Sequence, residues 1–106
     1  MTSLVQSIIP EIRTTLSTIY GARLVKLLLF GSQARGDADP GSDIDLLVVL
    51  KEPMNPCEEI SRVNEATSRL SLAYDTVISC LFMHEDRYLH EKSPLLLNIR
   101  REGVPL

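Results

Sequence analysis

Residues 31–50 read GSQARGDADPGSDIDLLVVL, and this stretch decides the fold and the chemistry that we expect of the chain. Its last eight residues, DIDLLVVL (43–50), form an apolar run that is too short for a surface helix and predicts a buried strand. The sequence DPG at 39–41 marks a turn before that strand. Residues 32–35 can form one helical turn. The stretch therefore predicts a core strand with an acidic entrance, preceded by a glycine-containing turn.

Apolar runs on either side of this stretch predict two more strands of the same sheet. They are RLVKLLLF (23–30) and DTVISCLFM (75–83). Helical periodicity and capping residues predict the flanking helices: residues 3–20, a long helix capped by Asn55, residues 84–91 and residues 93–101. The element order αβ(α)βαβαα predicts an α/β (α+β) fold, with a small sheet of three or more strands flanked by helices.

Length and composition favour one domain over residues 1–106. The formal net charge of -3 lacks the basic excess that non-specific nucleic-acid binding requires. The longest unbroken apolar run, Leu46 to Leu50, is far shorter than the roughly 20 residues of a membrane-spanning helix, so we expect no membrane association. Without a secretory signal at the N-terminus, and with only Cys57 and Cys80 as cysteines, we expect a cytoplasmic protein with free thiols.

Asp43 and Asp45 open the predicted strand 43–50 and are the first candidate site. Side chains alternate along a strand, so both carboxylates point to one face and Ile44 points to the other. Such a pair can simply be a polar strand entrance after a turn. However, two like charges at the edge of a core strand repel each other unless a cation or ligand neutralises them. Paired carboxylates suit Mg²⁺, so we expect a metal site here.

Asp75 opens the predicted strand 75–83 and is the third candidate carboxylate. If a right-handed helical crossover joins strands 43–50 and 75–83, they are parallel and their first residues lie at the same edge of the sheet. Asp75 would then lie beside Asp43 and Asp45. An aspartate that follows a helix can also be an ordinary turn residue, and that interpretation stays open.

Gly31 and Ser32 follow the predicted strand 23–30, where backbone N–H groups and a hydroxyl could hold phosphate oxygens. For these residues to share a site with the aspartates, the first two strands must be antiparallel, which makes the sheet mixed. The glycine spacing also matches a Walker A loop, but Asp37 stands where that loop requires lysine, which excludes it. Arg35 either contacts a phosphate or forms a surface ion pair.

The order of these features resembles the nucleotidyltransferase superfamily that includes DNA polymerase beta. The shared pattern is Gly31-Ser32, ten intervening residues, Asp43-Ile44-Asp45 and a later aspartate. The string GSQARGDADPGSDIDLLVVL and the ending REGVPL are similar to the minimal nucleotidyltransferases, small domains often encoded next to a helical HEPN-domain partner. The resemblance covers nearly the whole chain and implies the nucleotidyltransferase fold.

The resemblance also implies a role for each candidate residue. The two carboxylates of the Asp-x-Asp pair would bridge two Mg²⁺ ions, and Asp75 would complete the ion that activates the acceptor hydroxyl. Gly31 and Ser32 would hold the outer phosphates of a nucleoside triphosphate, with Arg35 as a further nucleotide-binding candidate. The acceptor oxygen would attack the α-phosphorus in line, and pyrophosphate would leave.

These features favour an enzyme that transfers AMP from ATP to a hydroxyl of a partner protein. A chain of 106 residues leaves no room for the domains with which polymerases and antibiotic-modifying relatives bind a template or drug. In the family, such pairs behave as toxin and antitoxin, and the minimal domain modifies a tyrosine of the HEPN protein. Two alternatives stay open: a non-catalytic binding antitoxin or regulatory subunit, and transfer to a small molecule such as an aminoglycoside. A homo-oligomer also stays open.

Overall fold

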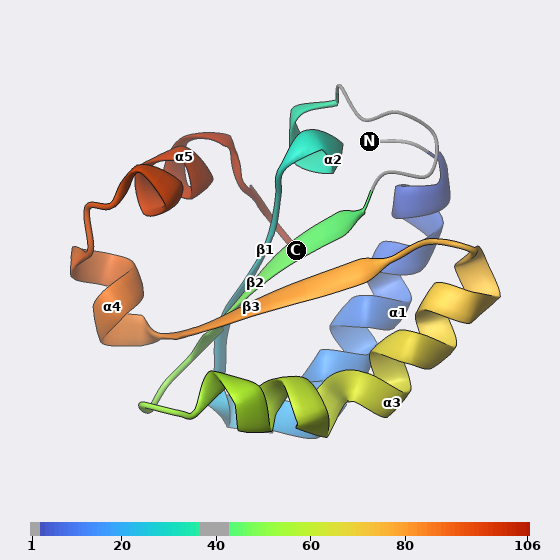
Figure 1. The fold of residues 1–106 in the computed structure, drawn as a ribbon, viewed down its shortest axis with the longest axis horizontal. Helices are drawn as coiled ribbons and strands as arrows, with labels where there is room; N and C mark the ends of the chain where they lie inside the picture. Colours follow the sequence, from blue (N-terminus) through green and yellow to red (C-terminus); the bar gives the residue numbers. More distant parts are fainter. Residues whose placement is uncertain (1–2, 37–42) are drawn as a thin grey trace.

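A four-stranded sheet organises the computed structural model, which describes residues 3–36 and 43–106 (Figure 1). The strand order is β3-β2-β1-β4. The central strand β2 pairs antiparallel with β1 and parallel with β3, while β4 pairs antiparallel with β1. The strands are β1 (Leu24–Phe30), β2 (Ile44–Leu50), β3 (Ile78–His84) and β4 (Val104–Pro105). This mixed α/β arrangement confirms the fold class that the sequence predicts.

Helices cover both faces of the sheet (Figure 1). On one face α1 and α3 pack side by side, and on the other face α4 and α5 lie against the strands. The helices are α1 (Ser3–Tyr20), the 3₁₀ turn η1 (Gly21–Arg23), α2 (Ser32–Arg35), α3 (Pro56–Tyr74), α4 (Glu85–His90) and α5 (Pro94–Glu102). None of the helices in the described residues is long and apolar enough to cross a membrane.

Burial on both faces explains the nearly continuous apolar sequence of β2. Its even-numbered residues belong to the core formed with α1 and α3, whereas Leu47 and Val49 belong to the core formed with α5. Asp45 is the one residue of this strand that is not buried. Because side chains alternate, Asp45 lies on the same face as Leu47, the face of α4 and α5.

The third strand begins at Ile78, so the prediction that Asp75 opens it is wrong. Asp75 instead caps the C-terminus of α3 in the left-handed conformation, with a φ of 50°, and its N–H donates to the carbonyl of Ser71. Aspartate tolerates this conformation better than most residues other than glycine. The alternative interpretation, an aspartate that ends a helix at a turn, therefore describes its backbone.

Candidate active site

Asp43 and Asp45 lie where β2 begins, at the edge of the sheet that also holds the end of β1. Asp45 pairs with Phe30, the last residue of β1, which confirms that the glycine turn and the acidic pair meet. Asp43 is exposed and Asp45 is half-buried. Both carboxylates are therefore at a strand end that a substrate can reach.

The environment of Asp45 disfavours its negative charge. Burial raises the pKa of this carboxyl, and the neighbouring charge of Asp43 raises it further. The two carboxylates thus repel each other at a partly desolvated position. A bound cation would offset both costs, which is the property expected of a metal-binding pair.

Gly31 joins the turn after β1 to this acidic pair. Its φ is 77°, and a Cβ atom at this position would lie 2.5 Å from the carboxylate oxygen Oδ2 of Asp45. No side chain fits there, so the backbone of Gly31 lies directly against the carboxylate. The helical turn α2 begins at the next residue, Ser32, and the N–H groups of Ala34 and Arg35 donate to the carbonyl of Gly31.

Arg35 extends from α2 toward α5, where its Nη1 atom lies 3.6 Å from Oε2 of Glu102. The alternative surface partners Asp37 and Asp39 lie outside the described residues. Between the turn and α5 there is a pocket of about 240 Å³, lined by Phe30, Gly31, Arg35, Leu95, Asn98, Ile99 and Glu102. The glycine turn therefore borders the acidic pair through Asp45 and borders this pocket through Gly31 and Arg35.

The structure does not place Asp75 in one cluster with the other two carboxylates. No group of three acidic, histidine or cysteine residues that could hold a metal occurs within residues 3–36 and 43–106. The residue of β3 that pairs with Asp45 is Ser79, and paired residues of parallel strands share a face. A hydroxyl thus occupies the place beside Asp45 where the sequence-based interpretation expects a carboxylate.

Two sets of residues near the pair are absent from the sequence-based candidates. Ser79 could have been found from alternation, because Ile78 and Cys80 are apolar residues that pack against the core and the residue between them must face the other way. The pocket residues of α5 follow the spacing i, i+3, i+4, i+7 from Leu95, which marks one helix face. Only the contact between that face and the turn after β1 shows that it borders the site.

The cysteines offer no alternative chemistry at this edge. Cys57 is exposed on α3, and Cys80 packs against the core of α1 and α3. Burial raises the pKa of the Cys80 thiol to about 11, so it is protonated at neutral pH and a poor nucleophile.

A family comparison identifies this arrangement. The sequence pattern of the nucleotidyltransferase domain matches residues 9–98, a range that contains every site residue that the sequence predicts. The chain belongs to the nucleotidyltransferase family. This nucleotidyltransferase is also similar to MJ0141 of Methanocaldococcus jannaschii, whose name proposes a protein adenylyltransferase. The two are 44% identical over 72 residues, which cover 68% of this chain and 72% of that relative.

Solved structures share the fold of this nucleotidyltransferase. A crystal structure of a toxin-antitoxin with AMP-PNP matches with a TM-score of 0.65 and 20% identity, covering 91% of this chain and 69% of that one. The tri-AMPylated HEPN toxin of Shewanella oneidensis in complex with its MNT antitoxin matches with a TM-score of 0.61 and 18% identity, covering 94% and 69%. At these identities the likeness concerns the fold.

Proposed function

We propose that this nucleotidyltransferase transfers AMP from ATP to a hydroxyl of a partner protein, and that the partner is a HEPN-domain toxin that it neutralises. The observation that carries the proposal is the contact of Gly31 with Asp45. It joins a turn suited to phosphate oxygens to a pair of carboxylates suited to a divalent cation.

The choice of acceptor and partner is supported by the relatives. MJ0141 carries a name that proposes transfer of adenylate to protein. Two of the similar folds come from toxin-antitoxin complexes, one with AMP-PNP and one with a tri-AMPylated HEPN toxin. These printed names support a nucleotide donor and a protein acceptor for this chain, and the partner would supply the acceptor surface.

Asp43 and Asp45 would hold Mg²⁺. The donor set fits, because two carboxylates stand together and no side chain at position 31 separates Asp45 from the phosphate-binding turn. When bound, Mg²⁺ would neutralise charge on the triphosphate and the leaving pyrophosphate. The family resemblance implies two such ions, and Asp75 lies apart from this pair, at the end of α3.

The remaining residues would position the nucleotide. The backbone of Gly31 and the hydroxyl of Ser32 would donate hydrogen bonds to the outer phosphate oxygens, and the guanidinium of Arg35 would offset their charge. The acceptor hydroxyl would lose its proton to solvent as its oxygen bonds to the α-phosphorus. The bond from that phosphorus to the pyrophosphate oxygen would break at the same centre.

A labelling experiment tests the proposal. The protein is incubated with Mg²⁺, ATP labelled at the α-phosphate and the protein that its neighbouring gene encodes, and label on each chain is measured by gel and intact mass. We expect label on the partner, and only background label with the Asp43→Ala, Asp45→Ala double variant. Asp86→Ala is the matched control, because this carboxylate is 77% exposed on α4, and it should label the partner normally.

Each other outcome contradicts a stated part of the proposal. No label on the partner, together with a tight complex that still neutralises it, would indicate a binding antitoxin without catalysis. Label that persists in the double variant would show that the acidic pair does not hold the required cation. Efficient transfer to an aminoglycoside but not to the partner would assign a small-molecule acceptor.

A further inference from the structure

The outer edge of β3 has no role in the chemistry derived above. We infer that this edge binds an extended segment of the partner protein as an added strand, and that the segment carries the acceptor hydroxyl to the acidic pair. The inference rests on the proposed function, because it states how the acceptor of that reaction is presented. It assigns a binding surface on β3 and α3, which contribute none of the proposed phosphate or metal ligands.

The order of the strands decides the side from which an acceptor approaches. Phe30 of β1, Asp45 of β2 and Ser79 of β3 lie in one row across the sheet. The proposed phosphate-binding turn follows Phe30, at the β1 end of this row. In phosphoryl transfer the attacking and leaving oxygens lie roughly in line, on opposite sides of the phosphorus. With pyrophosphate held on the β1 side of Asp45, the acceptor oxygen comes from the β3 side.

The edge of β3 on that side can pair with another strand. β3 is the last strand of the sheet, and Figure 1 shows no strand beside its outer edge among the described residues. The N–H of Ile44 donates to the carbonyl of Val77 at 2.8 Å, so Val77 directs its carbonyl toward β2. Successive residues of a strand direct their backbone groups to opposite edges, so Ile78 and Cys80 direct theirs away from the sheet. These groups are therefore placed to bond with an added strand.

The spacing of the sheet places an added strand within reach of the acidic pair. Neighbouring strands lie about 4.7–4.9 Å apart, so a residue paired with Ser79 on the added strand lies about 10 Å from the backbone of Asp45. Paired residues share a face, so this residue points to the same side of the sheet as Ser79 and Asp45. Ser79 is exposed and small, so an acceptor side chain can pass over it. The acceptor side chain and the α-phosphate together span the distance.

A groove beside β3 fits the residue next to the acceptor. Side chains alternate along a strand, so the residues on either side of the acceptor point toward α3. A groove of about 270 Å³ lies there between α3 and β3, and its lining includes Ile60, Val63, Thr67 and Cys80. None of its lining residues is charged. The segment that binds therefore carries an apolar residue directly beside the acceptor.

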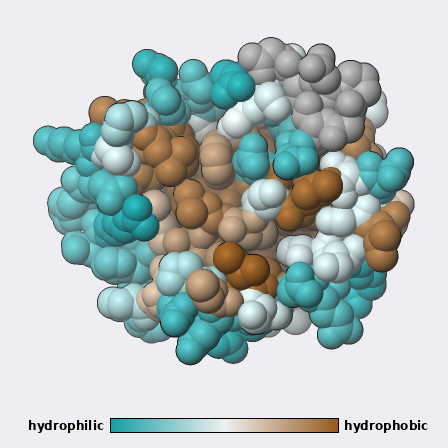
Figure 2. Space-filling model, in the orientation of Figure 1, coloured by the Kyte–Doolittle hydropathy of each residue, from teal (hydrophilic) through white to brown (hydrophobic). Residues whose placement is uncertain are grey.

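The surface around this edge supports an apolar, extended occupant. Val77 is 54% exposed beside the free edge, and Ile60 in the groove is 49% exposed. Figure 2 shows hydrophobic surface across the middle of the face on which β3 lies in Figure 1. Natural proteins protect exposed edge strands with charged side chains or proline, and residues 77–83 contain neither. This edge is therefore suited to being paired in the working complex.

Amide hydrogen exchange tests the mode of binding directly. Exchange is measured residue by residue by NMR, in the intact chain and in its complex with the protein that the neighbouring gene encodes. In the complex we expect exchange of the Ile78 and Cys80 N–H groups to slow by about tenfold or more, because the added strand accepts hydrogen bonds from them. By the same alternation Ser79 and Leu81 donate toward β2 in both states, so their exchange should change far less.

Substitutions on α3 test the part of the groove in acceptor binding. Ile60→Glu places a charge in the groove, and the matched control Leu72→Glu places the same charge on the same helix, where Leu72 is 85% exposed and does not line the groove. In the labelling experiment we expect Ile60→Glu to raise the KM for the partner by about tenfold, because the bound segment would remove the charge from water. Leu72→Glu should behave as the parent.

Two further measurements separate acceptor binding from the rest of the reaction. With Ile60→Glu, kcat and the binding of inorganic tripolyphosphate with Mg²⁺, measured by calorimetry, should stay as in the parent, because the groove lies apart from the phosphate-binding turn. Asn64→Glu, at an exposed position that lines the same groove, carries the test if Ile60→Glu does not fold, as judged by circular dichroism.

Other results overturn the inference in distinguishable ways. If the partner is labelled but the N–H groups of Ile78 and Cys80 exchange alike in both states, the acceptor approaches by another route and the proposed function is untouched. If their exchange slows in the chain alone as its concentration rises, a second copy covers the edge instead. If Ile60→Glu and Leu72→Glu give the same KM, the groove does not bind the acceptor segment. If tripolyphosphate does not bind and the partner takes no label, the proposed function fails together with the inference.

Discussion

At the scale of single residues, the backbone of Gly31 runs past the carboxylate of Asp45 at a positive φ of 77°. A side chain there would strain the backbone and would place its Cβ atom 2.5 Å from Oδ2 of Asp45. We expect Gly31→Ala to lower the free energy of unfolding by about 1–3 kcal/mol and to abolish binding of tripolyphosphate with Mg²⁺. Urea denaturation and calorimetry measure the two effects.

Gly21 supplies the control for this substitution. It also has a positive φ, 56°, but nothing lies within 4 Å of a Cβ atom built there. Gly21→Ala should therefore carry only backbone strain and keep full binding of tripolyphosphate. Equal loss of stability and equal binding in the two variants would show that the contact with Asp45 has no consequence.

Ser79 is the residue beside Asp45 on the neighbouring strand. Ser79→Asp would add a third carboxylate on the same face, at an exposed position. We expect it to raise the affinity for Mn²⁺ about tenfold and to lower the melting temperature of the metal-free protein, because three like charges repel one another. Ser79→Asn matches its size without the charge and should leave both quantities unchanged. Unaltered Mn²⁺ affinity in Ser79→Asp would contradict the placement.

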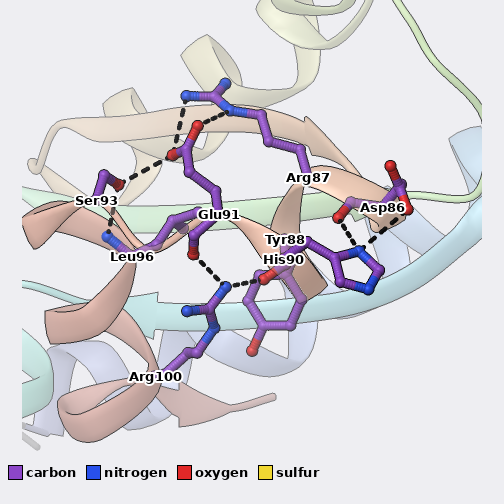
Figure 3. Close-up of polar contacts among 8 residues, drawn as sticks. All are labelled: Asp86, Arg87, Tyr88, His90, Glu91, Ser93, Leu96 and Arg100. Carbon is purple, nitrogen blue, oxygen red and sulfur yellow. Dashed lines mark hydrogen bonds and ion pairs between the residues drawn. The ribbon is translucent and has the colours of Figure 1, made fainter.

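At the scale of elements, a polar network fixes the connection between α4 and α5 (Figure 3). Glu91 accepts hydrogen bonds from Arg87 at 2.9 Å and from the hydroxyl of Ser93 at 2.9 Å. Ser93 in turn caps α5 by accepting from the N–H of Leu96. Arg100 of α5 reaches back and donates to the carbonyls of Tyr88 and Glu91. This network holds the helix that forms one wall of the pocket.

Glu91 makes the stability of this connection dependent on pH. The hydrogen bond from Arg87, followed by that from Ser93, lowers the pKa of Glu91 below its ordinary value of 4.5. A lowered folded-state pKa stabilises the fold above the unfolded-state value, and this stabilisation is lost as the pH falls through the folded-state value. We expect Glu91→Gln to melt at a lower temperature than the parent at neutral pH, and the difference to shrink toward zero in acid.

Melting curves recorded by circular dichroism across this pH range measure the difference. Glu65→Gln, an exposed position on α3, is the control and should melt like the parent protein at neutral pH. A difference for Glu91→Gln that stays constant from neutral to acidic pH would show that the charge of Glu91 does not stabilise the connection.

At the scale of the whole molecule, a buried hydrogen bond joins the end of α1 to the start of α3. The hydroxyl of Tyr20 donates to Oε1 of Glu59 at 2.8 Å, and Arg62 pairs with the same oxygen at 3.0 Å. Glu59 is only 3% exposed. Burial and the bond to Glu59 raise the pKa of Tyr20, so it remains a hydrogen-bond donor at neutral pH. The network fixes how the two helices cover their face of the sheet.

Tyr20→Phe should lower the free energy of unfolding by about 1–3 kcal/mol, because a buried carboxylate loses a donor. Tyr74→Phe is the matched control, since Tyr74 also joins α3 to α1 through Glu11, whose side chain is exposed. Its bond is solvated, so the cost should be smaller. Urea denaturation measures both, and equal costs would contradict the importance of burial.

Much of the site can be read from the sequence because it depends on neighbouring residues. Asp43 and Asp45 share a face because strand side chains alternate. The nearly continuous apolar run of β2 predicts a strand buried on both faces, and the structure confirms it. The meeting of Gly31 with the acidic pair follows once β1 and β2 are antiparallel, and their register confirms this arrangement.

The rest depends on contacts between segments far apart in the chain, which local patterns do not encode. Asp75 is a helix cap because α3 ends beside it. Ser79 lies beside Asp45 because of the register between β3 and β2. The pocket exists only because the end of α5 packs near the turn after β1, across more than half of the chain. The sequence by itself thus determined the acidic pair, the glycine turn and the mixed sheet through local periodicity. Only the tertiary structure decided which residues surround them, because register and helix packing are set by burial across the whole molecule.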